Sequence, residues 1–99
     1  MTISLDTQIT IPETVYTQEV GEETILLDTQ GGRYFSLDPV GTRMWQLIRQ
    51  YGALRPAYET LLSEYDVGGD RLETDLLQLT EKMIEKGLAN LQAHGSMTA

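Results

Sequence analysis

The fold is decided at residues 33–45, RYFSLDPVGTRMW, where a strand ends and a helix begins. Residues 33–37 contain aromatic and apolar side chains in a short run that is typical of a strand. Asp38-Pro39 is a helix start signal, because Asp caps the free N–H groups of a first turn and Pro suits the first helical position. The apolar positions that follow have helical spacing. They predict a helix from Pro39 to Tyr51 that ends at Gly52.

Two more strands are predicted before this stretch. Residues 15–20 and 24–28 are short β-forming runs, and the turn residues Gly21-Glu22-Glu23 lie between them. Gln30-Gly31-Gly32 then supplies the positive φ angles that a tight hairpin needs before residue 33. The three strands therefore predict an antiparallel meander. Residues 10–12 should be extended, with Pro12 outside any central ladder.

Two more helices are predicted after residue 52. The first should begin near Arg55-Pro56 and break at residues 66–70. The second should begin with Asp70 as N-cap and Glu73 completing a capping box, and end at Lys86 with Gly87 as C-cap. The fold class is thus α+β, a three-stranded antiparallel sheet followed by three helices. Residues 1–91 should form one domain and residues 92–99 a flexible tail.

The residues that usually carry catalysis are scarce. The chain has no cysteine, which excludes disulfides and thiolate chemistry, and its one histidine, His94, lies in the expected tail. No nucleophile elbow, phosphate loop or dinucleotide fingerprint occurs, and the carboxylates lack EF-hand spacing. We therefore predict that the protein is not an enzyme and needs no metal ion or other cofactor.

The charge of the chain indicates which classes of partner it can bind. The formal net charge is −8, and the seven Lys and Arg residues are scattered, which argues against nucleic acid and favours a basic or neutral partner. The N-terminus lacks the basic and apolar regions of a signal peptide. No apolar run approaches the roughly 20 residues that span a bilayer. These features predict a cytoplasmic protein with no membrane partner.

One feature of the third predicted helix leaves two interpretations open. Its apolar residues form two neighbouring stripes, Leu72, Leu76, Leu79 and Met83 beside Leu77, Thr80, Ile84 and Leu88. Together they cover an arc of about half the helix circumference. Either the whole arc is core, or one border lines a groove. The strand at residues 33–37 indicates where such a groove would lie, because a strand at the edge of a sheet can accept a peptide as an added strand.

The same residues resemble a known family. Residues 34–45 with Leu47-Ile48, and Asp75-Leu76 with Leu79, Met83 and Gly87-Leu88, resemble PqqD-like proteins over roughly residues 15–91. These proteins are recognition elements for ribosomally synthesised, modified peptides, and they have a winged-helix-like fold. The resemblance implies that the chain binds the leader of a precursor peptide as an added strand between its third strand and third helix. It would then present the leader to modifying enzymes.

The resemblance also implies the site residues by position. Arg33, Tyr34, Phe35, Ser36 and Leu37 would provide the strand edge. Leu76, Leu79, Thr80 and Met83 would face the apolar side chains of the leader, and Asp75 would offer a polar or charged contact. Leu26 and Tyr34 would complete pockets.

The pathway has one favoured interpretation and two alternatives. The Asp-Pro-x-Gly-x-x-x-Trp form at residues 38–45 is most similar to the stand-alone recognition proteins of lasso-peptide biosynthesis, which work with a leader peptidase and a cyclase. A peptide chaperone for a radical-SAM enzyme is an alternative, although its Asn-x-x-Ala form is absent here. A winged-helix DNA-binding protein is the second alternative. The acidic residues of the third helix, Glu73, Asp75, Glu81 and Glu85, would meet DNA phosphates with the wrong sign.

Overall fold

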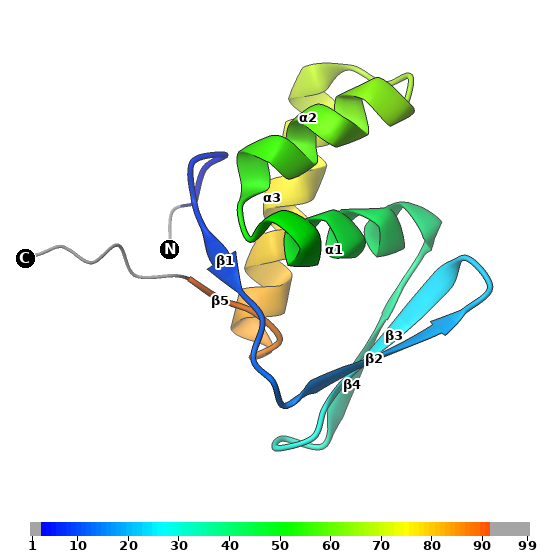
Figure 1. Ribbon diagram of the computed structural model, residues 1–99, viewed down its shortest axis with the longest axis vertical. Coiled ribbons are helices and arrows are strands. Elements are labelled where there is room, and N and C mark those ends of the chain that lie inside the picture. The colour runs from blue at the N-terminus through cyan, green and yellow to red at the C-terminus, as the bar shows by residue number, and fades with distance from the viewer. Residues whose placement is uncertain (1–2, 92–99) are drawn as a thin grey trace, which may run out of the picture.

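The computed structural model describes residues 3–91, in which an antiparallel sheet lies beside three helices (Figure 1). The sheet has the order β2-β3-β4, from β2 (Val15–Val20), β3 (Glu23–Asp28) and β4 (Arg33–Leu37). The three predicted strands and their antiparallel meander are confirmed. The predicted tail at residues 92–99, with His94, lies outside the described residues, as do residues 1–2.

Alternation along β3 sets which face of the sheet meets the helices. Thr24, Leu26 and Asp28 are buried, whereas Ile25 and Leu27 are exposed on the opposite face. The hairpin to β4 closes through Gly32, which has φ of 67° and donates its N–H to the Asp28 carbonyl at 2.8 Å. The turn is confirmed where the sequence predicted it, but only Gly32 of the glycine pair has the positive φ that was expected of both.

The three helices are α1 (Pro39–Tyr51), α2 (Leu54–Glu64) and α3 (Gly69–Glu85). α1 begins and ends at the residues that the sequence predicted. Asp38 Oδ1 accepts a hydrogen bond from the Gly41 N–H at 2.7 Å, and Gly52, with φ of 65°, donates its N–H to the Ile48 carbonyl. Both ends of α1 are thus satisfied by the residues expected to cap it. The fold agrees with an α+β domain, and "winged-helix-like" describes it only loosely, because the sheet precedes all three helices.

The predicted start of α3 was wrong. Gly68, not Asp70, is the N-cap, and no side chain caps this end, so the capping box with Glu73 is not formed. Gly69 lies against α2, where a Cβ on this residue would come within 2.6 Å of the Tyr58 hydroxyl oxygen. This packing lets the helix begin earlier, and Asp70 lies in the first turn, where its charge suits the helix dipole. The other end is close to the prediction: Lys86 is the C-cap and Gly87 follows it with φ of 77°.

Two short strands were not predicted. β1 (Ile9–Thr10) and β5 (Asn90–Leu91) pair with each other, and Figure 1 shows them side by side near the lower end of α3. The Ile9 N–H also donates to the carbonyl of Gly52, at the end of α1. The N-terminal segment therefore joins residues 90–91 to the corner between α1 and α2.

Packing places α1 between the sheet and the other helices. α1 packs against β3 and β4, and α2 packs against both α1 and α3. The core is drawn from all of these elements, and its largest fully buried side chains are Trp45, Ile9, Leu26, Leu47, Ile48, Leu54, Leu61, Leu76, Met83 and Leu88. On the rim, both oxygens of Glu64 accept hydrogen bonds from Arg43, at 2.8 and 2.6 Å, which joins α2 to α1.

We expect the cap of α1 to be measurable in the stability of the whole domain. Asp38→Ala removes the acceptor for the Gly41 N–H and should lower the free energy of unfolding by about 1 kcal/mol. Asp38→Asn keeps an acceptor oxygen and should retain most of the stability. Urea unfolding followed by circular dichroism measures both. Equal losses for the two variants would contradict a capping role.

The Arg43–Glu64 pair should make stability depend on pH in one direction. The hydrogen bonds from Arg43 lower the pKa of Glu64. This contribution is therefore present above the ordinary glutamate pKa of about 4.3, and is lost as the pH falls through the lower folded-state value. Glu64→Gln should destabilise the domain at pH 7 by at most about 1 kcal/mol, because the pair is partly exposed. The difference from the unmodified protein in urea unfolding should disappear once the pH is below the folded-state pKa of Glu64.

Candidate functional site

A cleft of about 590 Å³ lies between β4 and α3. β4 is the last strand of the sheet, so one of its edges has no neighbouring strand among residues 3–91. α3 packs on α2 and not closely on β4, which leaves the space between them open. The cleft therefore combines an unpaired strand edge with one face of a long helix.

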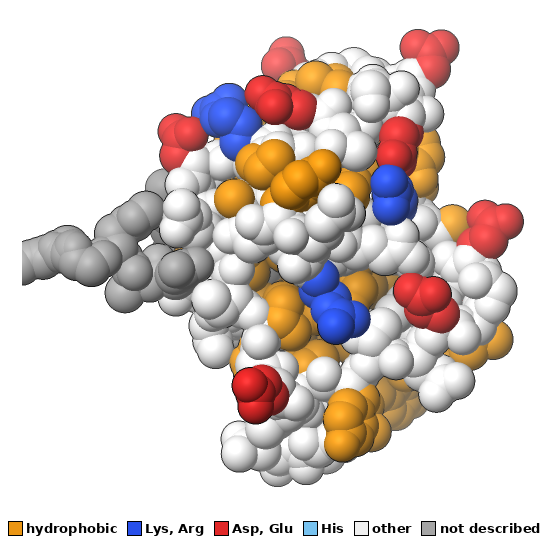
Figure 2. Space-filling view, in the orientation of Figure 1, with side chains coloured by type: hydrophobic (Ala, Val, Ile, Leu, Met, Phe, Trp, Pro, Cys, Tyr) orange, Lys and Arg blue, Asp and Glu red, His pale blue; other side chains and the backbone are white. Residues whose placement is uncertain are grey.

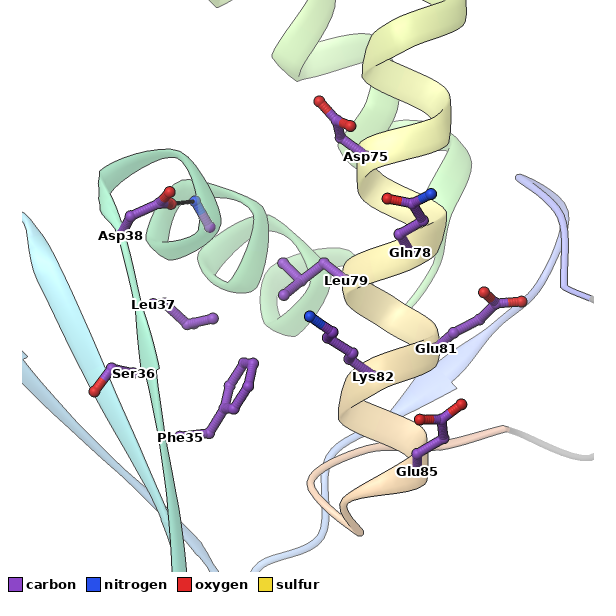
Figure 3. Close-up of a pocket in the computed structure, with 11 residues that line it drawn as sticks. Phe35, Ser36, Leu37, Asp38, Asp75, Gln78, Leu79, Glu81, Lys82 and Glu85 are labelled. Carbon is purple, nitrogen blue, oxygen red and sulfur yellow. Dashed lines mark hydrogen bonds between the residues drawn. The ribbon is translucent and has the colours of Figure 1, made fainter.

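The apolar part of the cleft comes from both of its walls. Phe35 and Leu37 line it from β4, and Leu79 extends toward them from α3 (Figure 3). Ser36 extends to the other side of the strand in the same view, as strand alternation requires. Phe35 and Leu79 are half-buried and pack against the core, so they present part of their surface to the cleft. This arrangement suits apolar side chains of an extended peptide.

The polar part of the cleft is spread along its length. Asp38 and Asp75 lie near one end, and Gln78, Glu81, Lys82 and Glu85 follow along α3 (Figure 3). Two of the carboxylates already have partners within the chain. Asp38 caps α1, and Asp75 lies 3.8 Å from the Arg71 guanidinium.

A second hollow of about 300 Å³ lies at the start of β4. It is lined by Gly32, Arg33, Tyr34, Lys86 and Leu88. The Lys86 ammonium lies 5.8 Å from the centre of the Phe35 ring, within reach of a cation–π interaction. Phe35 lines the larger cleft, so the two hollows are neighbours along β4, although no residue lines both.

Four of the predicted site residues lie in the core instead of on the cleft surface. Leu26, Leu76, Thr80 and Met83 are all 0% exposed. The Thr80 hydroxyl donates to the Leu76 carbonyl at 2.8 Å within the helix. These four side chains therefore have no exposed surface on the cleft, and their contact with a peptide stays a prediction. The wide apolar arc of α3 is therefore mostly core, and Leu79 is on its open border.

The other predicted residues border one of the two hollows, although Leu37 is only 4% exposed, and the structure adds several more. Phe35, Ser36, Leu37, Asp75 and Leu79 line the cleft, and Arg33 and Tyr34 line the second hollow. Sequence reasoning missed Asp38, Gly41, Gln78, Glu81, Lys82 and Glu85. A signal for part of this set was present, since residues 75, 78, 82 and 85 recur every three or four positions and so share one helix face with Leu79.

The ionisable side chains of the cleft are spread along it and do not converge on one point. Its carboxylates are dispersed along α3, and within residues 3–91 no three His, Asp or Glu side chains are placed to share a metal ion. No helix in the described part of the chain has the length and apolar character needed to cross a membrane. Basic side chains on the face shown in Figure 2 are separated from one another, unlike the clustered cations of a phosphate-binding surface.

Comparison with known proteins yields one family and two similar structures. Residues 23–89 match the family described as coenzyme PQQ synthesis protein D (PqqD). The structure of TbiB1 in complex with the TbiA(beta) leader peptide is 29% identical, with a TM-score of 0.75, over 87% of this chain and 98% of that chain. A lasso peptide synthetase B1 complexed with the leader peptide is 22% identical, with a TM-score of 0.75, over 84% and 98%, and it supports the fold alone. No curated protein sequence matches the chain.

Thiol labelling should separate the open border of α3 from its buried face. The chain has no cysteine, so one introduced thiol reports on one position. Leu79→Cys should react quickly with a thiol reagent in the folded protein, because Leu79 lines the cleft. Leu76→Cys should react at least about tenfold more slowly, since position 76 is buried and opens only with local unfolding. Similar rates for the two variants would contradict the assignment of Leu76 to the core.

Proposed function

Because the chain belongs to the PqqD family, we propose that it binds the leader segment of a ribosomally synthesised precursor peptide as an added strand on β4. The observation that carries this proposal is the unpaired edge of β4 beside an open cleft. The leader would run between β4 and α3 and extend the sheet by one strand. TbiB1 and the lasso peptide synthetase B1, which have similar structures, are both in complex with leader peptides.

Both the strand edge and the cleft are needed for useful affinity. A ladder hydrogen bond contributes about 0.5–1.5 kcal/mol net, and β4 has only five residues along which to form them. Ordering a flexible peptide also costs free energy, which part of the ladder must offset. Apolar side chains of the leader buried against Phe35, Leu37 and Leu79 would supply the remaining stabilisation.

We further propose that the module presents its leader to a leader peptidase and a cyclase in lasso-peptide maturation. A second protein needs its own contact surface, and the outer face of the sheet offers one. Tyr16, Leu27 and Tyr34 stand opposite one another across β2, β3 and β4, and their side chains are exposed. A leader added to β4 would continue this face, so a partner could contact the module and the leader together.

The module would act as a carrier without catalysing a reaction or holding a cofactor, in the cytoplasm, where the precursor leaves the ribosome.

The match to the PqqD family supports a second candidate, a peptide chaperone for a radical-SAM enzyme. The identity of the precursor encoded beside the gene distinguishes the two. We set aside DNA binding, because the acidic face of α3 is unsuited to phosphates.

A labelled leader is the direct probe of this function. The leader of the precursor encoded beside the gene, carrying fluorescein, should bind with a Kd in the micromolar range or lower, measured by fluorescence anisotropy. Trp45 is only 1% exposed and lies in the core, so its fluorescence is a poor reporter of the cleft. Amide protection on β4 that appears on binding would support strand addition. Absence of binding to this leader would contradict the proposal.

Truncation of Leu79 should weaken leader binding without unfolding the domain. Leu79→Ala removes apolar surface from the cleft wall and should raise the Kd by about tenfold, which corresponds to about 1.4 kcal/mol. Leu62→Ala is the matched control, because Leu62 is a partly exposed leucine on α2 that does not line the cleft. It should change the Kd by less than twofold. Equal effects of the two substitutions in the anisotropy titration would contradict the role of this wall.

A further inference from the structure

The basic residues of this acidic protein are not distributed at random with respect to the cleft. Three arginines lie within 4.0 Å of a carboxylate: Arg43 pairs with Glu64, Arg55 with Asp6 and Arg71 with Asp75. Arg49 donates a hydrogen bond to Thr17. The other three are Arg33, Lys82 and Lys86, and none of them has an ion-pair partner among residues 3–91.

These three side chains lie around the two hollows beside β4. Lys82 lines the larger cleft and extends from α3 toward β4, next to Leu79 (Figure 3). Lys86 and Arg33 line the smaller hollow, and the Lys86 ammonium is near the Phe35 ring. We call Arg33, Lys82 and Lys86 the cationic end of the cleft.

The carboxylates nearby do not neutralise this end. Glu81 and Glu85 extend from α3 on the side away from β4, and Asp38 and Asp75 lie toward the other end of the cleft (Figure 3). Asp28 is the cross-strand neighbour of Arg33 and is the one carboxylate close to this end, but it forms no ion pair within 4.0 Å, and its Oδ1 accepts the Gln30 N–H. Among residues 3–91 the three cations therefore have no carboxylate in direct contact.

We propose that the cationic end of the cleft binds an acidic side chain, Asp or Glu, of the leader strand. This inference rests on the proposed function and adds the chemistry of one leader position to it. An acidic residue at that position would form charge-assisted hydrogen bonds to one or more of the three cations, partly shielded from water by Phe35 and Leu79. The apolar neighbours on the leader would lie on either side of it along the cleft.

The helix dipole explains only part of this arrangement. Lysines in the last turns of α3 suit the negative end of the dipole, wherever their side chains extend. Arg33 belongs to β4, so the preference of helix ends for lysine does not explain its place in the same hollow as Lys86. The overall charge of −8 also repels an acidic peptide at long range, so selection must come from these local contacts, within about a Debye length of 10 Å at 0.1 M salt.

Selection from a random library tests the inference separately from the proposed function. Phage-displayed 12-residue peptides are selected on the unmodified full chain, and those that fail to bind Leu79→Trp, which fills the cleft without changing its charge, are kept as cleft binders. We expect these peptides to share one position enriched in Asp or Glu. The double variant Lys82→Glu/Lys86→Glu should instead enrich Lys or Arg at that position. Cleft binders without an acidic position would overturn the inference and leave the proposed function intact, whereas a library with no cleft binders would overturn both.

A double-mutant cycle on one selected peptide measures how much the contact between its acidic residue and Lys82 and Lys86 contributes to the binding free energy. Replacing its acidic residue with the corresponding amide should raise the Kd about tenfold on the unmodified protein, and less than twofold on Lys82→Gln/Lys86→Gln. Arg49→Gln/Arg55→Gln is the matched control, because it removes two positive charges away from the cleft. On this control the full tenfold loss should remain. Equal losses on the unmodified protein and on Lys82→Gln/Lys86→Gln would overturn the inference.

Discussion

The unpaired edge of β4 is the constraint on which the rest of the structure depends. A three-stranded meander has two edges, and an edge strand carries backbone N–H and C=O groups without partners in the sheet. In this fold β4 passes into α1 with only Asp38 between them, and the Asp38 carboxylate holds the first turn of the helix. The junction fixes β4 against α1 and leaves its outer edge free. α3 then lies beyond that edge, at a distance that leaves a cleft.

The sheet and α1 could be predicted because their signals are local. Asp38, Pro39 and Gly52 each act on the backbone within one turn, and Gly32 acts at the hairpin through its own positive φ angle. The start of α3 was missed because it depends on Gly69 packing against Tyr58, a contact between two helices. The pairing of β1 with β5 joins residues 9–10 to residues 90–91, which are far apart in the sequence. Strands of two residues have no alternation to detect, so only the tertiary structure identifies them.

The candidate site was predictable as a pair of elements but not as a set of side chains. The apolar arc of α3 correctly indicated a helix with a wide buried face, and strand alternation correctly separated Phe35 from Ser36. Which border of the arc stays open depends on where α2 and the sheet pack, and that information is not in the periodicity. For this reason Leu76, Thr80 and Met83 were assigned to the cleft although they are core. The net charge of −8 is summed over the whole chain, so it did not reveal the cationic end of the cleft. There, three cations have no ion-pair partner among the described residues.

In the proposed complex, backbone pairing, apolar contacts and charges differ in how strongly they select one peptide over another. Backbone pairing on β4 is insensitive to sequence, since every residue except proline offers the same N–H and C=O groups. The apolar wall of Phe35, Leu37 and Leu79 discriminates only coarsely, because one methylene more or less changes the free energy of burial by about 0.8 kcal/mol. A charged side chain placed against the wrong sign, or buried without a partner, is disfavoured more strongly. A small module with an open strand edge therefore needs a few charges beside that edge to reject the many other extended segments that would fit it.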